Sequence, residues 1–456
     1  MDASTAAPAR PQRGDELDLR IDNLAYGGAG VGRLGGYVVF VRDAVPGDRV
    51  RAVVTKRKRA YAEARTVEVL EPSPERIPPV ADHPGAPWQV LPYARQLEVK
   101  SEQVDDALRR IGHLEGYELE PIVPAVEQWR YRNKLEYSFG TTPDGELICG
   151  FHAPGSWEDI VHVEDCVLAS ERGNEARRAV LEWCRARGLG AYDRRAQEGL
   201  LRNLVVREGR RTGQLQVRLV TSDEDVDLEG LADAVGADSL LWTRAADVGE
   251  TTAGGDTEVL RGTDWIDEEL TVAGVPLGIR ISAEAFFQTN TEMAEALYGT
   301  AVEFAGLQGW ERVYDLFCGI GTIGLGLASR AGELWGLEIV EDAIADAMVN
   351  ARRNEIRNAN FFAGDVRLAL RDLVERAGRP DVLVVDPPRA GLSAKIVRRI
   401  IEASPKRIVY VSCNPTTLAP NAAQLADAGW ALRRVRPVDM FPQTPHIECV
   451  ALLERT

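Results

Sequence analysis

The chain of 456 residues lacks the marks of membrane and secreted proteins. No stretch approaches the roughly 18 consecutive apolar residues that a membrane-spanning helix requires. Residues 1–13 are rich in Ala, Pro and Arg and contain no apolar core, so they predict a disordered tail and not a signal peptide. We therefore expect a cytoplasmic protein without a membrane partner.

Cysteine is scarce and scattered. The sequence contains no Cys-x-x-Cys pair, which argues against both a disulfide framework and a zinc ribbon. We accordingly expect no metal site. The six cysteines are Cys149, Cys166, Cys184, Cys318, Cys413 and Cys449.

Positive charge is in deficit, with a formal net charge of −16. Because phosphate contacts require Lys and Arg, this deficit would argue against a nucleic-acid partner if it were evenly spread. Residues 222–270, however, contain 15 acidic and 2 basic side chains, whereas residues 1–72 contain 10 acidic and 12 basic ones. One acidic segment can face away from an anionic partner, so the net charge does not exclude RNA.

Residues 14–72 predict a small β-barrel. Short alternating strands are expected at Glu16–Leu24, Tyr37–Val41, Arg49–Thr55 and Ala62–Leu70. The run Lys-Arg-Lys-Arg at 56–59, followed by Tyr61, lies between the last two strands. It is either a solvated hairpin tip or a phosphate-contacting loop whose tyrosine stacks on a base.

The remaining sequence divides near residue 283. Before it, a proline-rich linker (72–92) is followed by a helical pattern at Leu97–Leu114 and then by strands and a helix, which predict an α+β region. After it, strands and helices alternate, which predicts a doubly wound parallel sheet closed by an antiparallel strand.

Two motifs in the doubly wound region favour an adenosine-type cofactor. The run Asp-Leu-Phe-Cys-Gly-Ile-Gly-Thr (315–322) ends a strand in a glycine-rich turn, and Glu338 ends the next strand, where a carboxylate accepts hydrogen bonds from ribose hydroxyls. The Asp-x-Phe-x-Gly-x-Gly pattern favours S-adenosylmethionine over NAD. Asp365 ends a third strand and either binds the adenine amino group or caps a helix.

The next two strands end in reactive groups. Asp386-Pro-Pro-Arg forms a rigid turn suited to holding a substrate base beside a methyl donor. Cys413 ends a run of β-formers and is either an apolar plug or a nucleophile. Glu448 opens the last, otherwise apolar strand and is a candidate base, with His446 as its rival.

Methylation of uracil at carbon 5 needs all of these groups. Carbon 5 becomes nucleophilic once a thiolate has added to carbon 6, and after methyl transfer a base must remove the proton at carbon 5. The substrate base must also be lifted out of its stack. Cys413 and Glu448 fit the two chemical roles.

The motifs occur together and in the order found in the RNA 5-methyluridine methyltransferase family, which this chain resembles over nearly its whole length. They include Phe-Phe-Gln-Thr-Asn (286–290) and Asp-Met-Phe-Pro-Gln-Thr-x-His-Ile-Glu (439–448). The resemblance implies Cys413 as nucleophile and Glu448 as proton acceptor. It also implies S-adenosylmethionine contacts at Gln288, Phe317, Thr322, Glu338, Asp365 and Asp386.

The resemblance further implies a domain plan and an RNA partner. Residues 14–72 resemble the OB-like TRAM barrel, 73–282 would form a central RNA-binding domain, and 283–456 a Rossmann-like class I methyltransferase domain. A helix near 97–124 would pack on the catalytic domain. The barrel favours ribosomal RNA (23S) over transfer RNA as target, and we expect a monomer.

One stretch departs from the family pattern. Many members with this barrel bind an iron–sulfur cluster through Cys-x5-Cys-Gly-Gly-Cys and a distant fourth cysteine. Here residues 83–89 read His-Pro-Gly-Ala-Pro-Trp-Gln, and only Cys166 resembles a ligand. One thiolate cannot hold a four-thiolate cluster, so we predict no iron–sulfur cluster and a buried apolar role for Cys166. Cys318 and Cys449 are interpreted as packing residues.

Two other classes of function compete with this hypothesis. An amino-group methyltransferase acting on adenine or cytosine typically has an aromatic residue after the two prolines, where this chain has Arg389, and it does not need Cys413. A non-catalytic RNA-binding protein would not need the pair Cys413 and Glu448.

Overall fold

The structure is a computed structural model of the chain, and it describes residues 10–245, 252 and 254–456. The chain divides into two compact units. The first comprises residues up to 82, 86–105 and 441–446, and the second comprises the rest. None of the described helices has the length and apolar character needed to cross a membrane.

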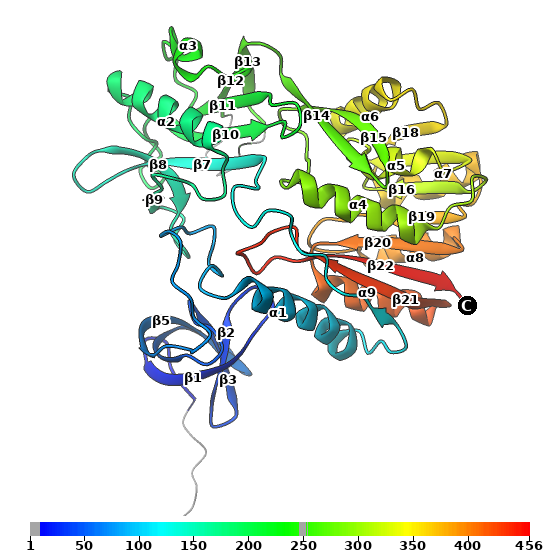
Figure 1. The fold of residues 1–456 in the computed structure, drawn as a ribbon, viewed down its shortest axis with the longest axis horizontal. Helices are drawn as coiled ribbons and strands as arrows, with labels where there is room; N and C mark the ends of the chain where they lie inside the picture. The colour runs from blue at the N-terminus through cyan, green and yellow to red at the C-terminus, as the bar shows by residue number, and fades with distance from the viewer. Residues whose placement is uncertain (1–9, 246–251, 253) are drawn as a thin grey trace, which may run out of the picture. The chain divides into compact units, whose positions relative to one another are not determined.

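The first unit is built on a closed five-stranded barrel, drawn in blue in Figure 1. Its strands follow the order β1-β2-β3-β5-β4 around the barrel. Alternating residues point inward, such as Val50, Ala52 and Val54 of β4, and form an apolar core. The strands are β1 (Glu16–Leu24), β2 (Gly30–Leu34), β3 (Tyr37–Arg42), β4 (Arg49–Arg57) and β5 (Tyr61–Glu71).

Helix α1 (Tyr93–Asp106) completes the first unit together with the loop 441–446. The side chain of Gln96 donates to Gln443 Oε1 over 2.8 Å and accepts from the Gln443 amide at 3.0 Å. Lys100 Nζ donates to the carbonyl of Phe441 over 3.0 Å. This loop, distant in sequence from the barrel, is therefore fixed to the first unit by buried polar contacts.

The expected helix near 97–124 is shorter than predicted and begins earlier. After α1 the chain forms one π-helical turn, η1 (Ala107–Ile111), which packs on helix α9 (Pro415–Asp427) of the second unit. Strand β6 (Glu118–Leu119) then pairs with β21 (Trp430–Val438) at the edge of the C-terminal sheet.

A seven-stranded sheet with two helices forms the α+β part of the second unit (Figure 1). A turn at Thr142–Gly145 joins its strands β7 and β8. The elements are β7 (Lys134–Thr141), β8 (Leu147–His152), β9 (Ile160–His162), α2 (Glu171–Ala186), β10 (Leu201–Glu208), β11 (Leu215–Thr221), α3 (Leu231–Val235), β12 (Ser239–Arg244) and β13 (Asp256–Arg261).

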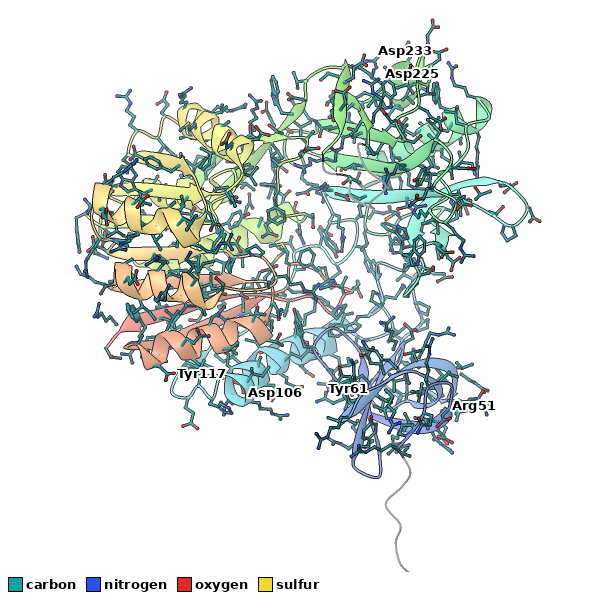
Figure 2. The ribbon with its side chains drawn as sticks, turned by 180° about the vertical axis from the view of Figure 1, so that it is seen from behind. Arg51, Tyr61, Asp106, Tyr117, Asp225 and Asp233 are labelled. Atoms are coloured by element: carbon teal, nitrogen blue, oxygen red, sulfur yellow. The ribbon has the colours of Figure 1, made fainter. Side chains whose placement is uncertain are left out.

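Asp225 and Asp233 of the acidic segment lie at one end of this α+β part (Figure 2). Part of the negative charge is neutralised locally. Asp225 lies 3.8 Å from Arg244, and Asp233 pairs with Arg261. The last residues of the segment begin a hairpin of β14 (Trp265–Val272) and β15 (Val275–Ser282).

An eight-stranded sheet ends the chain, in the order β18-β17-β16-β19-β20-β22-β21-β6. Its first five strands are parallel, and β22 runs antiparallel to β20, as predicted. This is the doubly wound sheet expected from the sequence, and with the N-terminal barrel it confirms the predicted fold class. The strands are β16 (Arg312–Leu316), β17 (Glu333–Glu338), β18 (Ala359–Ala363), β19 (Val382–Val385), β20 (Arg407–Ser412), β21 (Trp430–Val438) and β22 (Glu448–Arg455).

Several helices of this sheet begin at side-chain caps. Asn290, Ser393 and Asn414 each accept a backbone N–H at the start of a helix. The helices are α4 (Thr291–Ala305), α5 (Thr322–Ala328), α6 (Glu341–Arg353), α7 (Val366–Ala377), α8 (Ala394–Ala403) and α9 (Pro415–Asp427).

Candidate active site

The predicted reactive residues meet at the carboxyl edge of the parallel strands. Phe317 follows β16, Glu338 ends β17, Asp386 follows β19 and Cys413 follows β20. Pairing brings Leu316 opposite Val385 and Val385 opposite Tyr410, so these strand ends lie side by side. Ligands of open α/β sheets bind at this edge.

Cys413 is partly exposed, whereas the other five cysteines are buried. Its position is set by the turn that starts α9. The Asn414 side chain accepts from the Thr416 amide at 3.0 Å and donates to the carbonyl of Arg389 at 3.0 Å. Asn414 thereby ties the cysteine turn to the Asp-Pro-Pro-Arg loop, a role that the sequence alone did not assign to it.

Glu448 lies beside Cys413 because β22 pairs with β20. Ser412 is paired with Cys449, so the adjacent residues Cys413 and Glu448 lie at the same end of the two strands, where their charges interact. Glu448 is only 3% exposed. Burial, followed by the charge of Asp386, raises the pKa of Glu448 well above the usual range of a carboxyl group.

The thiol of Cys413 responds to the same surroundings. Burial, followed by the charges of Glu448 and Asp386, raises its pKa to about 11, while the guanidinium of Arg389 acts in the opposite direction. The isolated site therefore favours the neutral thiol. A positive charge brought close to Cys413 would favour its thiolate form.

Asp315 and Tyr298, which were not among the predicted site residues, lie close to Asp386. Asp315 is fully buried, its Oδ2 accepts from the Gly324 amide at 2.9 Å, and its Oδ1 has no hydrogen-bond partner among the described residues. Tyr298 of α4 is buried near Thr322, and burial raises the pKa of its hydroxyl. Burial raises the pKa of Asp386 to about 7, and burial followed by the charge of Asp386 raises that of Asp315 to about 8.

The sequence marks only part of this group, because Asp315 lies in a motif and Tyr298 does not. Asp315 opens the glycine-rich motif, so its place at a strand end was readable from the sequence. Tyr298 lies in the middle of a helix and carries no motif, so only the packing of α4 on the sheet reveals it. Buried carboxyls without cationic partners favour a cationic ligand, because its charge stabilises their ionised forms.

The glycine-rich turn has the backbone shape of a nucleotide cradle. Phe317, Gly319 and Gly321 all have positive φ (63°, 52° and 88°). A Cβ on Gly321 would lie 3.3 Å from Ala347 and Phe361, so the turn packs closely on the sheet. Glu338 accepts from the Gly319 amide at 3.3 Å and from the Ile339 amide at 2.7 Å, which holds its carboxylate at the turn.

The other residues predicted to contact the cofactor, Thr322, Gln288 and Asp365, lie in different surroundings. Thr322 begins α5, next to the turn. Gln288 is buried before α4, where its carbonyl accepts from Asn133 at 2.9 Å. Asp365 caps α7 by accepting from the Arg367 amide at 2.8 Å, and it also binds the Arg367 guanidinium. Of the two roles expected for Asp365, adenine binding and helix capping, its side chain thus makes the contacts of a helix cap.

His446 belongs to the loop 441–446 of the first unit, where its ring meets that of Phe441 edge to face with centroids 6.0 Å apart. It stays an alternative base by sequence position, two residues before Glu448. The expected packing roles of Cys318 and Cys449 agree with their burial.

Cys166 is buried as expected, but it is not simply an apolar residue. Its sulfur lies 3.2 Å from Nε2 of His83, and its backbone amide donates to Asn174 at 2.9 Å. The ring of His83 in turn packs on Phe151, with centroids 5.2 Å apart. In the parts of the chain that the structure describes, no three His, Cys, Asp or Glu side chains are arranged to hold a metal ion.

The basic run 56–59 forms an exposed hairpin tip between β4 and β5. The hydroxyl of Tyr37 donates to the carbonyl of Lys58 over 2.6 Å, and Tyr61 packs edge to face on Phe40 with centroids 5.4 Å apart. Tyr61 is half-buried, so the aromatic residues support the tip as well as bordering it.

The fold and the site define a class I S-adenosylmethionine-dependent methyltransferase. Its features are a Rossmann-like sheet, a glycine-rich turn, an acidic residue at the end of the second strand and an Asp-Pro-Pro loop. Comparisons with known proteins define the class further. A family profile described as "tRNA (Uracil-5-)-methyltransferase" matches residues 248–456, and a TRAM domain profile matches residues 10–67. The chain belongs to this RNA uracil-C5 methyltransferase family.

Full-length relatives agree with the profiles. An RNA methyltransferase of Bacteroides thetaiotaomicron, described as uncharacterized, is 39% identical and covers 94% of this chain and 100% of its own. One from Halalkalibacterium halodurans is 38% identical, with 97% of each chain covered. The crystal structure of Pyrococcus abyssi tRNA (uracil-54, C5)-methyltransferase in complex with S-adenosyl-L-homocysteine superposes with a TM-score of 0.77 at 29% identity, covering 96% of this chain and 100% of that one.

S-adenosylmethionine is thus the cofactor, and the residues present fit it. Glu338 offers a carboxylate beside the glycine-rich turn, the turn 317–321 gives a close backbone approach, and the buried carboxyls suit a cation. When bound, the cofactor supplies an electrophilic methyl group and a positive charge at the sulfonium.

Proposed function

We propose that this enzyme methylates carbon 5 of a uridine in RNA, with Cys413 as nucleophile and Glu448 as the base. The observation that supports this most directly is the pairing of β20 with β22. It brings the partly exposed cysteine of the chain beside a buried carboxyl group whose pKa is raised. A nucleophile and a base side by side at a cofactor-binding sheet edge are what carbon-5 chemistry requires.

The first role of the chain is to form a thiolate at Cys413. In the proposal, the thiol gives its proton to solvent as positive charge enters the pocket, aided by Arg389. Its sulfur then bonds to carbon 6 of the uracil, which breaks the π bond between carbons 5 and 6 and leaves an enolate that is nucleophilic at carbon 5. The carboxylate of Glu448 removes the proton from carbon 5 after the methyl group has been transferred there. Elimination then breaks the sulfur–carbon bond and restores both the uracil ring and free Cys413.

The raised pKa of Glu448 suits this sequence. A carboxylate held in a buried site is a stronger base than one in water, so it takes the carbon-5 proton more readily. Asp386 lies at the neighbouring strand end and contributes to that raised pKa. Its place beside the two reactive side chains suits the proposed contact with cofactor or substrate base.

The activity itself can be tested by incubating the protein with RNA and methyl-labelled S-adenosylmethionine and digesting the RNA to nucleosides. We expect the label in 5-methyluridine. Label found only in methylated adenosine or cytidine would instead establish an amino-group methyltransferase.

The roles of the two residues can be separated by trapping. The Glu448→Gln variant should accumulate a covalent RNA–protein adduct that survives denaturing electrophoresis, because elimination requires loss of the carbon-5 proton. The adduct should disappear in Glu448→Gln/Cys413→Ala and persist in the matched control Glu448→Gln/Cys449→Ala, which removes the adjacent buried thiol. Normal turnover by Cys413→Ala would contradict the nucleophile role.

For the RNA target we propose ribosomal RNA, by analogy with family members that have the N-terminal barrel. Transfer RNA is the alternative, and the Pyrococcus relative named above acts on it. Mapping 5-methyluridine in ribosomal and transfer RNA from cells with and without the gene distinguishes the two. The site missing its methyl group in the deleted strain identifies the substrate.

A further inference from the structure

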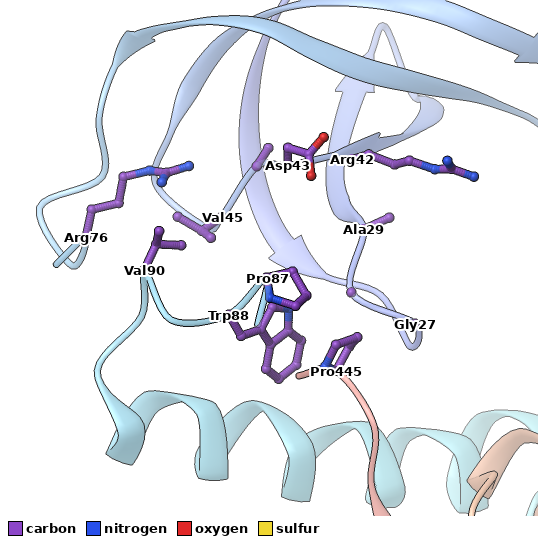
Figure 3. A pocket seen from close by; sticks show the side chains of 12 residues that line it. Gly27, Ala29, Arg42, Asp43, Val45, Arg76, Pro87, Trp88, Val90 and Pro445 are labelled. Carbon is purple, nitrogen blue, oxygen red and sulfur yellow. The ribbon is translucent and has the colours of Figure 1, made fainter. Parts of the chain in front are cut away.

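The first unit contains a cavity of about 460 Å³ that the proposed chemistry does not use. It lies between the barrel loops and the segment 87–90, and Pro445 of the loop 441–446 closes one side (Figure 3). All of its lining residues belong to the first unit. Its volume falls within the range of small-ligand sites and suffices for one nucleotide.

An unused hydrogen-bond donor lines this cavity. Trp88 is only 3% exposed, and its indole Nε1 donates to no acceptor in the described part of the chain. Nε1 is close to Gly28, another lining residue, since a Cβ added there would be 3.3 Å from it. Nε1 is not one of the fully enclosed unpaired atoms, so it keeps solvent access, and a ligand in the cavity can accept its hydrogen bond.

The rim adds positive charge. Arg42 is exposed and forms no ion pair among the described residues, whereas Arg76 is held by both oxygens of Asp48 at 2.8 Å. Figure 3 shows the two arginines at opposite ends of the cavity, with the rings of Trp88 and Pro445 together on its other side. Arg42 is therefore the cation available to a ligand.

Asp43 is the only carboxylate among the lining side chains. It has a left-handed backbone (φ 61°), a conformation that Asp and Asn tolerate better than most residues. Its oxygens can accept from ribose hydroxyls or from an amino group of a base. The site thus combines a ring surface, an indole N–H, one free cation and one acceptor, which is the chemistry that recognises a nucleotide.

We infer that this cavity binds one unpaired nucleotide of the RNA substrate, outside the catalytic pocket. The base lies against Trp88 and Pro445, with the indole N–H donating to it, and Arg42 contacts the adjoining phosphate. This rests on the proposed RNA substrate, but not on the chemistry assigned to Cys413 and Glu448. Because Pro445 precedes Glu448 by three residues, the bound nucleotide would contact the segment that leads into β22.

The test uses the full-length protein, a fluorescent single-stranded RNA 12-mer and fluorescence anisotropy at several salt concentrations. Ala29→Leu fills the cavity without changing charge, and Arg42→Ala removes the free cation. We expect each to weaken binding about tenfold, the scale of losing one stacked base or one phosphate contact. Arg42→Ala should also lower the slope of log affinity against log salt by about one, whereas Ala29→Leu should not.

Arg33→Ala is the matched control, because Arg33 is an exposed barrel arginine that pairs with Asp22 at 3.8 Å outside the cavity. It should bind RNA like the wild type, and all three variants should keep wild-type S-adenosylmethionine affinity and thermal stability. Equal losses for Arg33→Ala and Arg42→Ala would overturn the inference, as would unchanged RNA affinity of Ala29→Leu. So would failure of the wild type to bind the 12-mer, or equally tight binding of free mononucleotides.

Methyl transfer provides an independent readout. If the inference holds, Ala29→Leu raises the KM for RNA and leaves the rate at saturating RNA unchanged. A protein that shows these binding effects but transfers no methyl group to uridine would disprove the proposed function and support the cavity. Normal uridine methylation, together with wild-type RNA binding by Ala29→Leu and Arg42→Ala, would support the proposed function and disprove the role of the cavity.

Discussion

The thiol of Cys413 offers a direct test of the site, because its reactivity depends on the charge of Glu448. With a pKa of about 11, roughly one thiol in a thousand is ionised at pH 8. Replacing Glu448 by Gln removes a negative charge while conserving side-chain shape. The pKa of Cys413 should therefore fall, and alkylation of the thiol by iodoacetamide should become faster.

The size of the effect follows from the strand pairing. Side chains opposite each other on antiparallel strands are about 5 Å apart, where two unit charges interact by about 3 kcal/mol at an effective dielectric constant near 20. That equals about two pKa units, and partial exposure of Cys413 reduces it to about one. We thus expect alkylation of Glu448→Gln to be about tenfold faster once the pH exceeds the raised pKa of Glu448.

The dependence on pH has a definite sign. At a pH below the raised pKa of Glu448, that residue is neutral in the wild type, and the two proteins should react alike. The ratio of rates should grow as Glu448 ionises and vanish above pH 11, where both thiols are ionised. Arg389→Gln should have the opposite effect and slow the reaction, because the guanidinium of Arg389 lowers the pKa of Cys413.

The assay measures carboxamidomethylation of the Cys413 peptide by mass spectrometry between pH 7 and 11. The five buried cysteines should remain unmodified and serve as internal evidence that the protein stays folded. Glu454→Gln, on the same strand but partly exposed at its end, is the matched control and should react like the wild type. An equal or slower reaction of Glu448→Gln at every pH between 7 and 11 would refute the predicted proximity of the two side chains.

Three further predictions concern stability, the cofactor and metal content. Burial acts to raise the pKa of Asp48, but hydrogen bonds from Arg76 and two backbone amides lower it overall. Asp48→Asn should therefore reduce the free energy of unfolding by about 3 kcal/mol at pH 7. This difference should shrink below pH 4, because protonation of Asp48 removes the same contribution from the wild type. Urea unfolding at both pH values checks the prediction. Glu338→Gln should weaken S-adenosylmethionine binding about tenfold by calorimetry, since hydrogen bonds to a charged acceptor are lost, and unchanged affinity would exclude the ribose role. The purified protein should contain no iron and show no cluster absorbance; stoichiometric iron would contradict the reasoning from Cys166.

Local pattern was enough to predict the catalytic strands and most of their terminal residues. A strand end followed by Gly, Asn-Pro or Pro-Pro is marked by a few neighbouring residues, and parallel strands must present such ends at one edge of a sheet. Cys413, Asp386 and Glu338 were located in this way. Strand β2 was missed because its Gly-Val-Gly segment resembles a turn, and pairing with β1 and β3 overrides that weak propensity.

By itself the sequence determined which chemical groups the enzyme has and in which order the strands present them. Only the tertiary structure decided their environment, because burial and charge depend on residues far apart in the chain. The register of β20 on β22 brings Glu448 to Cys413, and the packing of α4 adds Tyr298. Likewise, α1 fixes the loop 441–446 to the barrel unit, so that Pro445 and Trp88 line the same cavity. These two residues are more than 350 positions apart in the sequence, and no local pattern encodes their proximity.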